Sequence, residues 1–104
     1  MIKLMAIYYQ PQEGERFDEE YYVKKHVPLV KKTLPGIVAT YYAKGMPTPA
    51  GDKPPVVGIG IFVWEDMELF KQAMSSPGIQ KIRADHPNYS TCKSEVVTFV
   101  VEEV

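Results

Sequence analysis

Four stretches of the chain are rich in hydrophobic residues and are short enough to be strands. Residues 2–9 and 56–64 place apolar side chains on both faces of an extended chain. Residues 36–45 are dominated by β-branched and aromatic residues, and residues 94–101 are again apolar on both faces. Strands of this kind are usually covered on both sides. We therefore expect a sheet of four strands with little of either face in water.

Between residues 17 and 34, hydrophobic residues recur at every third or fourth position, which predicts an amphipathic helix. Asp18 is placed to cap its N-terminus. Pro28 lacks a backbone N–H and presses on the preceding turn, so we expect a kink close to His26. The inner face of this helix carries Tyr22, His26, Leu29, Val30 and Thr33.

A second helix is predicted to start after Asp66 as N-cap, with Met67, Phe70 and Met74 on its inner side. Leu69 and Ala73 widen that inner face. Ser76 and Pro77 then open a short helix that reaches Arg83.

Two segments are predicted to be irregular. Residues 84–91 include His86, which we expect to be a solvated loop histidine because it precedes a proline. Residues 46–55 contain four prolines and are too long for a tight turn. We favour a surface connector for them over a flap above a pocket or an arm that reaches a second subunit.

The predicted order is β-α-β-β-α-β, which is the ferredoxin-like pattern of the α+β class, with a four-stranded antiparallel sheet. We expect residues 1–104 to form a single domain. Two helices cover only one face of such a sheet, yet three of its strands are apolar on both faces. Because soluble monomers avoid large exposed apolar surfaces, we expect a symmetric homodimer that forms through the sheet face.

Composition excludes several classes of partner. The chain has 104 residues, 12 basic and 13 acidic, and a formal charge of −1, which argues against nucleic acid or a membrane surface. No apolar run is long enough to span a bilayer. Because the chain starts directly with a strand pattern, we expect no signal peptide. The single cysteine, Cys92, has no partner within the chain for a disulfide. We therefore expect a cytoplasmic protein, and we expect Cys92 to be a buried or inert thiol.

The sequence contains no motif for a nucleotide, a metal or a catalytic serine. Gly58 and Gly60 lie within a strand and lack the context of a dinucleotide fingerprint. The two histidines are sixty residues apart, which is not a metal-site spacing. We expect neither a cofactor nor a metal.

His26 is the side chain best placed for chemistry. It titrates near neutral pH and lies on the apolar face of its helix, so it is either a structural histidine in the core or a general acid and base in a pocket. Gly58 and Gly60 leave space on the strand face that also carries Phe62 and Trp64. A packed helix or a bound ligand would each explain that space.

The stretch F-D-E-E-Y-Y-V-K-K-H-V-P-L at residues 17–29 resembles the EthD-like family of dimeric α/β-barrel proteins. The strand M-I-K-L before it is similar to the same family. So are the later segments W-E-D-M-E-L-F, S-S-P-G, A-D-H-P-N-Y and V-T-F-V-V-E-E-V. The resemblance implies a ferredoxin-like subunit that pairs through its sheet and holds a small pocket. It also implies that His26 matches the histidine that faces the pocket in several such enzymes, which include cofactor-free isomerases, cyclases, monooxygenases and dehydratases.

Three functions remain open from the sequence. The first is cofactor-free proton transfer, of the isomerase, dehydratase or cyclase type, on a small apolar carbonyl or aromatic compound. Its catalytic residues would be His26 and Tyr22, and its substrate-binding residues would be Tyr8, Phe62, Trp64 and Tyr89. The second is a non-catalytic accessory or ligand-binding dimer of a degradation pathway, or a dimer whose interior is only core. The third is a cofactor-free monooxygenase.

Overall fold

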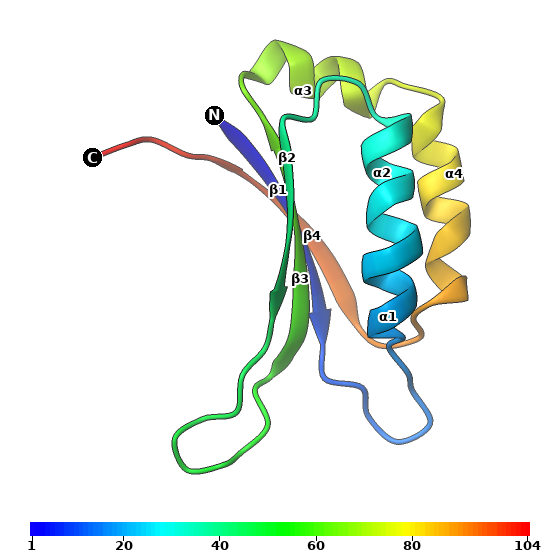
Figure 1. Ribbon diagram of the computed structural model, residues 1–104, viewed down its shortest axis with the longest axis vertical. Coiled ribbons are helices and arrows are strands. Elements are labelled where there is room, and N and C mark those ends of the chain that lie inside the picture. Colours follow the sequence, from blue (N-terminus) through cyan, green and yellow to red (C-terminus); the bar gives the residue numbers. More distant parts are fainter.

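The computed structural model describes residues 1–104 and contains one four-stranded sheet with all the helices on one face (Figure 1). Neighbouring strands are antiparallel and lie in the order β2-β3-β1-β4. The predicted α+β class and ferredoxin-like sheet are therefore confirmed. The elements are β1 (Ile2–Tyr9), α1 (Glu19–Tyr21), the π-helix η1 (Tyr22–His26), α2 (Val27–Thr33), β2 (Ala39–Lys44), β3 (Val56–Trp64), α3 (Met67–Met74), α4 (Gly78–Asp85), the 3-10 helix η2 (His86–Asn88) and β4 (Ser94–Val100).

The strand bounds agree closely with the prediction. β1 and β3 have the predicted limits, whereas β2 begins at Ala39 rather than at residue 36 and β4 ends at Val100. Residues 46–55 form the loop at the bottom of Figure 1, away from the helices, as expected for a surface connector.

The first helix is continuous from α1 through η1 to α2, and its π turn contains the predicted candidate residue. The Asp18 carboxylate accepts a hydrogen bond from the backbone N–H of Tyr21 at 3.0 Å, as expected of an N-cap. The backbone N–H of Val27 bonds to the carbonyl of Tyr22, five residues back. In a regular α-helix the ring of Pro28 would press on the carbonyl four residues before it. The wider π turn just ahead of Pro28 relieves that conflict, so the predicted disturbance near His26 is a π turn.

α3 begins as predicted, but its first residue does not face the core. The Asp66 carboxylate accepts from the N–H of Leu69 at 2.9 Å. Met67 was expected on the inner side, and this is wrong, because it is exposed. α3 starts beyond the end of β3, at the top of Figure 1, so its first turn does not reach the core. Ala73, in the last turn of α3, is fully buried, as expected of a residue on the inner face.

α4 extends further than the sequence predicted. The hydroxyl of Ser76 accepts from the N–H of Gly78 at 3.2 Å, and the helix runs to Asp85 and continues as η2. The expectation of irregular structure from residue 84 is therefore wrong for the first five residues. Pro87 lies in the first turn of η2, where a missing N–H costs nothing, so helical backbone continues through His86.

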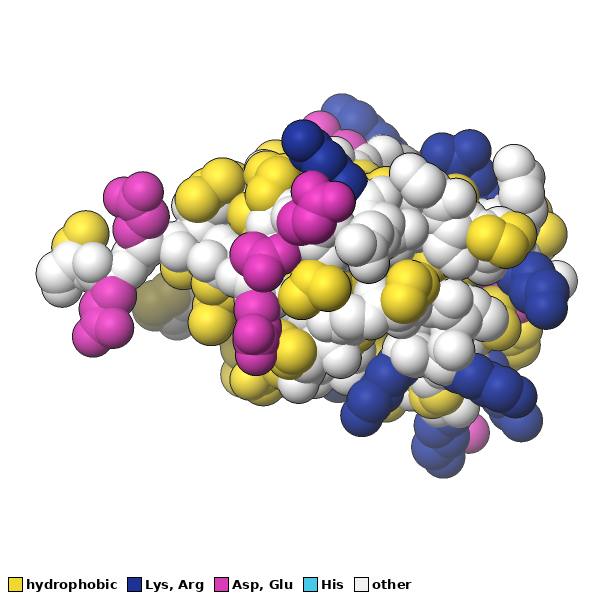
Figure 2. Space-filling view, turned by 90° about the horizontal axis from the view of Figure 1, so that it is seen from above, with side chains coloured by type: hydrophobic (Ala, Val, Ile, Leu, Met, Phe, Trp, Pro, Cys, Tyr) yellow, Lys and Arg dark blue, Asp and Glu magenta, His cyan; other side chains and the backbone are white.

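The two faces of the sheet have different surroundings. The inner face, which includes Leu4, Tyr8 and Phe62, packs against the helices. The outer face carries Met5, Ile61 and their neighbours and has no covering layer (Figure 1). Seen from above, Lys and Arg side chains gather on the helix side, and hydrophobic ones lie nearer the sheet and the C-terminal tail (Figure 2).

Candidate functional site

A cavity of about 540 Å³ lies between the inner face of the sheet and the helices α2 and α4. Thirteen of its 17 lining residues are hydrophobic, which suits a small, mostly apolar compound. Val96 on β4 lines the cavity and is still 64 % exposed, so the cavity opens toward β4.

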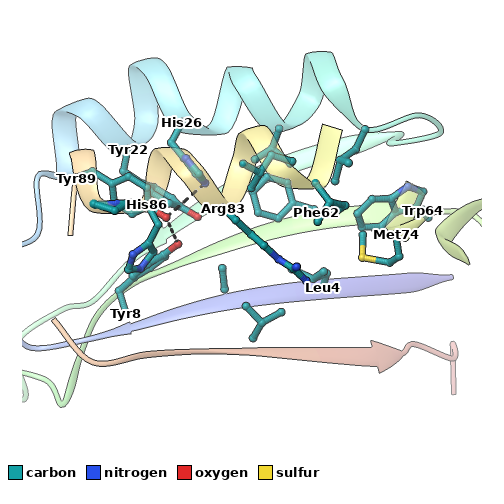
Figure 3. A pocket seen from close by; sticks show the side chains of 17 residues that line it. Leu4, Tyr8, Tyr22, His26, Phe62, Trp64, Met74, Arg83, His86 and Tyr89 are labelled. Atoms are coloured by element: carbon teal, nitrogen blue, oxygen red, sulfur yellow. Dashed lines mark hydrogen bonds between the residues drawn. The ribbon is translucent and has the colours of Figure 1, made fainter. Parts of the chain in front are cut away.

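All six residues predicted to form a site lie on the wall of this cavity. They come from β1, η1, β3 and the segment before β4, and the cavity has two unlike ends (Figure 3). Tyrosine hydroxyls and imidazoles gather at one end, whereas indole, phenyl and thioether groups line the other. The six residues are Tyr8, Tyr22, His26, Phe62, Trp64 and Tyr89. Their roles as catalytic and substrate-binding residues stay predictions.

His26 is 4 % exposed and forms a dyad with Asp85. Its Nδ1 lies 2.8 Å from Oδ2 of Asp85. The other carboxylate oxygen, Oδ1, accepts from the hydroxyl of Tyr21 at 2.7 Å and from the side-chain amide of Asn88 at 3.0 Å. Three donors thus hold the carboxylate in place, and the carboxylate in turn fixes the orientation of the imidazole.

A line of hydrogen bonds continues from His26 toward the sheet. The hydroxyl of Tyr89 lies 3.4 Å from Nε2 of His26 and 2.6 Å from the hydroxyl of Tyr8 (Figure 3). Because the carboxylate of Asp85 only accepts, Nδ1 carries the proton and Nε2 holds the lone pair. Tyr89 then donates to His26, and Tyr8 donates to Tyr89.

Burial and hydrogen bonding together set the protonation states of the dyad. Burial lowers the pKa of His26 below its ordinary value of 6.5, and the bond to Asp85 offsets only part of that effect. Burial alone would raise the pKa of Asp85, but its hydrogen bonds from Tyr21, Asn88 and His26 outweigh burial and leave the pKa below 3.8. At neutral pH the dyad is therefore a neutral imidazole beside a carboxylate.

The tyrosines of the cavity stay protonated. Burial raises the pKa of Tyr8, Tyr22 and Tyr89 above the ordinary value of 10.0. Each hydroxyl is therefore protonated at neutral pH and can donate a hydrogen bond.

Tyr22 carries a buried hydroxyl group without a hydrogen-bond partner. Its ring stacks on the imidazole of His26, with ring centroids 5.2 Å apart and an angle of 24° between the planes. Gly60 makes room for this side chain, and Gly58 makes room for Tyr42 from the neighbouring strand. The space above the two glycines is therefore filled by tyrosine side chains, one of them from the packed helix.

The sequence analysis missed three residues of the site. Asp85 was placed in an irregular segment and ends α4 instead, opposite His26. His86 was expected in solvent, but it is half-buried and lines the cavity, because η2 turns it toward Tyr8 and Tyr89. Arg83 also lines the cavity. The segment A-D-H-P-N-Y was a signal of family resemblance, but nothing in its spacing pairs Asp85 with a histidine 59 residues earlier.

Other kinds of site are not assembled here. No three His, Cys, Asp or Glu side chains come together in a way that could hold a metal ion. Cys92 is buried, as expected, with its Sγ 3.1 Å from the hydroxyl of Ser90. None of the helices has the length and apolar character needed to cross a membrane.

Comparisons with known proteins agree on the fold. The chain is similar to an EthD-like protein from Ralstonia eutropha JMP134, with 28% identity, a TM-score of 0.80 and coverage of 98% of this chain and 95% of that one. It is also similar to an ethyl tert-butyl ether degradation (EthD) family protein from Bacillus halodurans C-125, with 23% identity, a TM-score of 0.78 and coverage of 98% and 99%. SnoaB, a cofactor-independent oxygenase from Streptomyces nogalater, shares the fold with 16% identity, a TM-score of 0.62 and coverage of 99% and 94%.

These neighbours are proteins of the dimeric α/β-barrel fold, as the resemblance of residues 17–29 implied. Among curated proteins, none matches the sequence. The sequence model of the EthD domain family matches residues 10–91, which is most of the chain. This range includes His26, Asp85 and the tyrosines near them, except Tyr8. The chain therefore belongs to the EthD family.

Proposed function

We propose that this protein is a small-molecule enzyme that moves a proton next to a carbonyl group, without a cofactor, with His26 as the acid and base. The observation that carries the proposal is the His26–Asp85 dyad at the polar end of an apolar cavity. A histidine that served only the core would not need a carboxylate held by three donors. It would also not need to face a cavity.

The geometry supports a simple sequence of events. Nε2 of His26 holds the lone pair and contacts Tyr89 at 3.4 Å, a long hydrogen bond that a substrate displaces at little cost. The substrate C–H bond next to the carbonyl then breaks, its proton goes to Nε2, and its electron pair moves onto the carbonyl oxygen. Asp85 stabilises the imidazolium that forms. Return of the proton from Nε2 to another carbon, or loss of a leaving group, completes an isomerisation or an elimination.

The tyrosines supply donors for the negative charge that develops on the oxygen. The hydroxyls of Tyr89 and Tyr8 lie 2.6 Å apart and form a pair on one side of the cavity. The hydroxyl of Tyr89 becomes available when the substrate displaces it from His26. The hydroxyl of Tyr22 has no partner in the protein, so a substrate oxygen gives it one. Donors of this kind, placed in a site that excludes water, stabilise an enolate more strongly than water does. Phe62 and Trp64 contact the apolar part of the substrate.

We further propose that the working unit is a homodimer formed through the outer face of the sheet. That face carries Met5, Ile7, Ile59, Ile61 and Tyr41 without a covering layer. Neighbouring apolar side chains left uncovered on one face of a sheet are typical of an interface.

Hydrogen–deuterium exchange at carbon tests the proton transfer directly. The probes are 2-tetralone and a small panel of aromatic ketones and lactones in D2O, and the loss of the C–H signal next to the carbonyl is followed by NMR. We expect the protein to accelerate exchange of at least one probe by about 10²- to 10⁴-fold, as for a single well-placed base. His26→Asn should abolish the acceleration. Lys25→Asn, at the exposed neighbouring position, should keep it.

The other functions give different results in the same experiment. Probes that raise the melting temperature but never exchange would indicate a binding or accessory protein. Oxygen consumption on addition of a probe would indicate a monooxygenase. Acceleration that survives in His26→Asn would overturn the role of His26.

A further inference from the structure

The face of α4 that borders the cavity mixes apolar and basic side chains. Ile79, Ile82, Arg83 and His86 follow the i, i+3, i+4, i+7 spacing of one helix face, and all four line the cavity. Spacing of this kind normally brings only apolar side chains to a core. Here the second half of the face, Arg83 and His86, brings nitrogen groups to it instead.

Arg83 is the only Lys, Arg, Asp or Glu residue that lines the cavity. No Asp or Glu side chain is among the lining residues. Asp85 lies behind His26, where its oxygens are already used by Tyr21, Asn88 and His26. Arg83 is exposed to solvent at the cavity wall and has no hydrogen-bond or ion-pair partner in the protein, and its side chain runs from α4 in the direction of Leu4 (Figure 3). An arginine without a counter-ion at the wall of an apolar cavity is suited to bind an anionic group of a ligand.

We propose that the ligand of this cavity is a small aromatic or alicyclic carbonyl compound that also carries a carboxylate, and that Arg83 binds the carboxylate. The carbonyl end of this ligand rests on the proposed function, in which the carbonyl oxygen accepts hydrogen bonds from the tyrosine hydroxyls. Arg83 lies between the polar and apolar ends in Figure 3. His86 lies about one turn further along, at the start of η2. The anionic group therefore sits on the α4 side of the cavity, and the ring lies against β1 and β3.

Two nearly isosteric probes separate charge from shape. 2-Naphthoate and 2-acetylnaphthalene have the same ring system, but the first carries a carboxylate where the second carries a methyl ketone. Their dissociation constants are measured by calorimetry or by fluorescence titration. Arg83→Met keeps most of the aliphatic stem and removes the guanidinium group, which separates charge from simple packing of the stem. Lys81→Met removes a cation from an exposed position of the same helix and is the matched control.

We expect the unaltered protein to bind 2-naphthoate about fivefold more tightly than 2-acetylnaphthalene, as for an ion pair that stays partly solvated. The preference should vanish in Arg83→Met, persist in Lys81→Met, and weaken as salt is added. Equal binding of the two probes, or a preference that survives in Arg83→Met, would overturn the proposal and leave the proton chemistry at His26 untouched. If neither probe binds, the carboxylate proposal fails as well, and the exchange experiment with 2-tetralone shows separately whether the proposed function fails with it.

Discussion

Gly60 on β3 lies directly beneath the hydroxyl group of Tyr22 on η1, so closely that a Cβ atom at position 60 would overlap the hydroxyl oxygen. The tyrosine ring in turn stacks on His26. Because Gly60 has no side chain, Tyr22 can lie against the strand and pack beside His26. Contact between a strand glycine and a helix side chain is one of the reasons a strand keeps a glycine.

Gly60→Ala is therefore expected to lower the free energy of unfolding by about 1–3 kcal/mol, the usual cost of forcing extra volume into a packed site. It should also move Tyr22 away from His26. The measurement is urea unfolding followed by tryptophan fluorescence. The double variant Gly60→Ala with Tyr22→Phe removes the overlapping oxygen and should recover part of the loss. Equal stability of the single and double variants would show that the overlap is not the cause.

Tyr22→Phe on its own separates stability from activity. The hydroxyl is buried without a partner, and removing such a group should leave the protein equally stable or about 1 kcal/mol more stable. If the hydroxyl donates to a substrate oxygen, the rate of carbon–deuterium exchange should fall nevertheless. A variant that is more stable and equally active would limit Tyr22 to packing against His26.

Asp85→Asn should abolish most of the catalysis while leaving the cavity intact. Oδ1 accepts two hydrogen bonds, from Tyr21 and Asn88, so the amide oxygen of an asparagine takes that place and its NH2 group faces His26. The NH2 group donates to Nδ1 and moves the imidazole proton to Nε2, where a base is needed. We expect a loss of about 10²- to 10⁴-fold in exchange rate, as when a triad histidine is held in the wrong tautomer.

Nitrogen NMR of the histidine ring distinguishes this mechanism from simple disruption. The spectrum of Asp85→Asn should show the Nε2–H tautomer, and that of the unaltered protein the Nδ1–H tautomer. The affinity for a probe ketone should change little. A lost rate with an unchanged tautomer would contradict the positioning role of Asp85.

The stability of the protein should depend on pH through His26. Its pKa is below 6.5 in the folded protein because burial opposes the charge, so the unfolded chain binds the proton more readily. The free energy of unfolding is then expected to fall as the pH drops below 6.5 toward the lowered pKa. Above pH 6.5 the contribution of His26 to the free energy of unfolding should be constant. His26→Asn should flatten the slope in this window. A slope of the opposite sign would mean that Asp85 outweighs burial.

The sequence predicted the fold more completely than the site. The strands were recognisable because each is bounded by turn residues and has period-two or uniformly apolar faces. His26 was identifiable because its helix is long enough for its apolar side to be unambiguous. Pro28 signalled the disturbance beside it, although only the structure shows that a π turn relieves it.

The contacts that give His26 its environment were beyond the reach of the sequence. Asp85 and Tyr89 meet it from 59 and 63 residues away, across the packing of α2 against α4. Local periodicity carries no information on such pairs. His86 was misplaced because the rule that disfavours helix before proline was overcome by η2, in which proline occupies the first turn.

The outer face of the sheet offers the last test. Ile61 lies near its middle, beside Met5 on β1 and Tyr41 on β2, and Tyr41 is 57 % exposed in the subunit alone. A lysine at position 61 would be harmless on a free surface, but in a sheet-to-sheet interface it would bury a charge without a partner. Ile61→Lys is therefore expected to shift a dimer to monomers in sedimentation velocity at micromolar concentration. Gln72→Lys, which adds the same charge on the exposed side of α3, should leave the dimer intact. A protein that is monomeric before any substitution, or an Ile61→Lys variant that stays dimeric, would place the interface elsewhere or remove it.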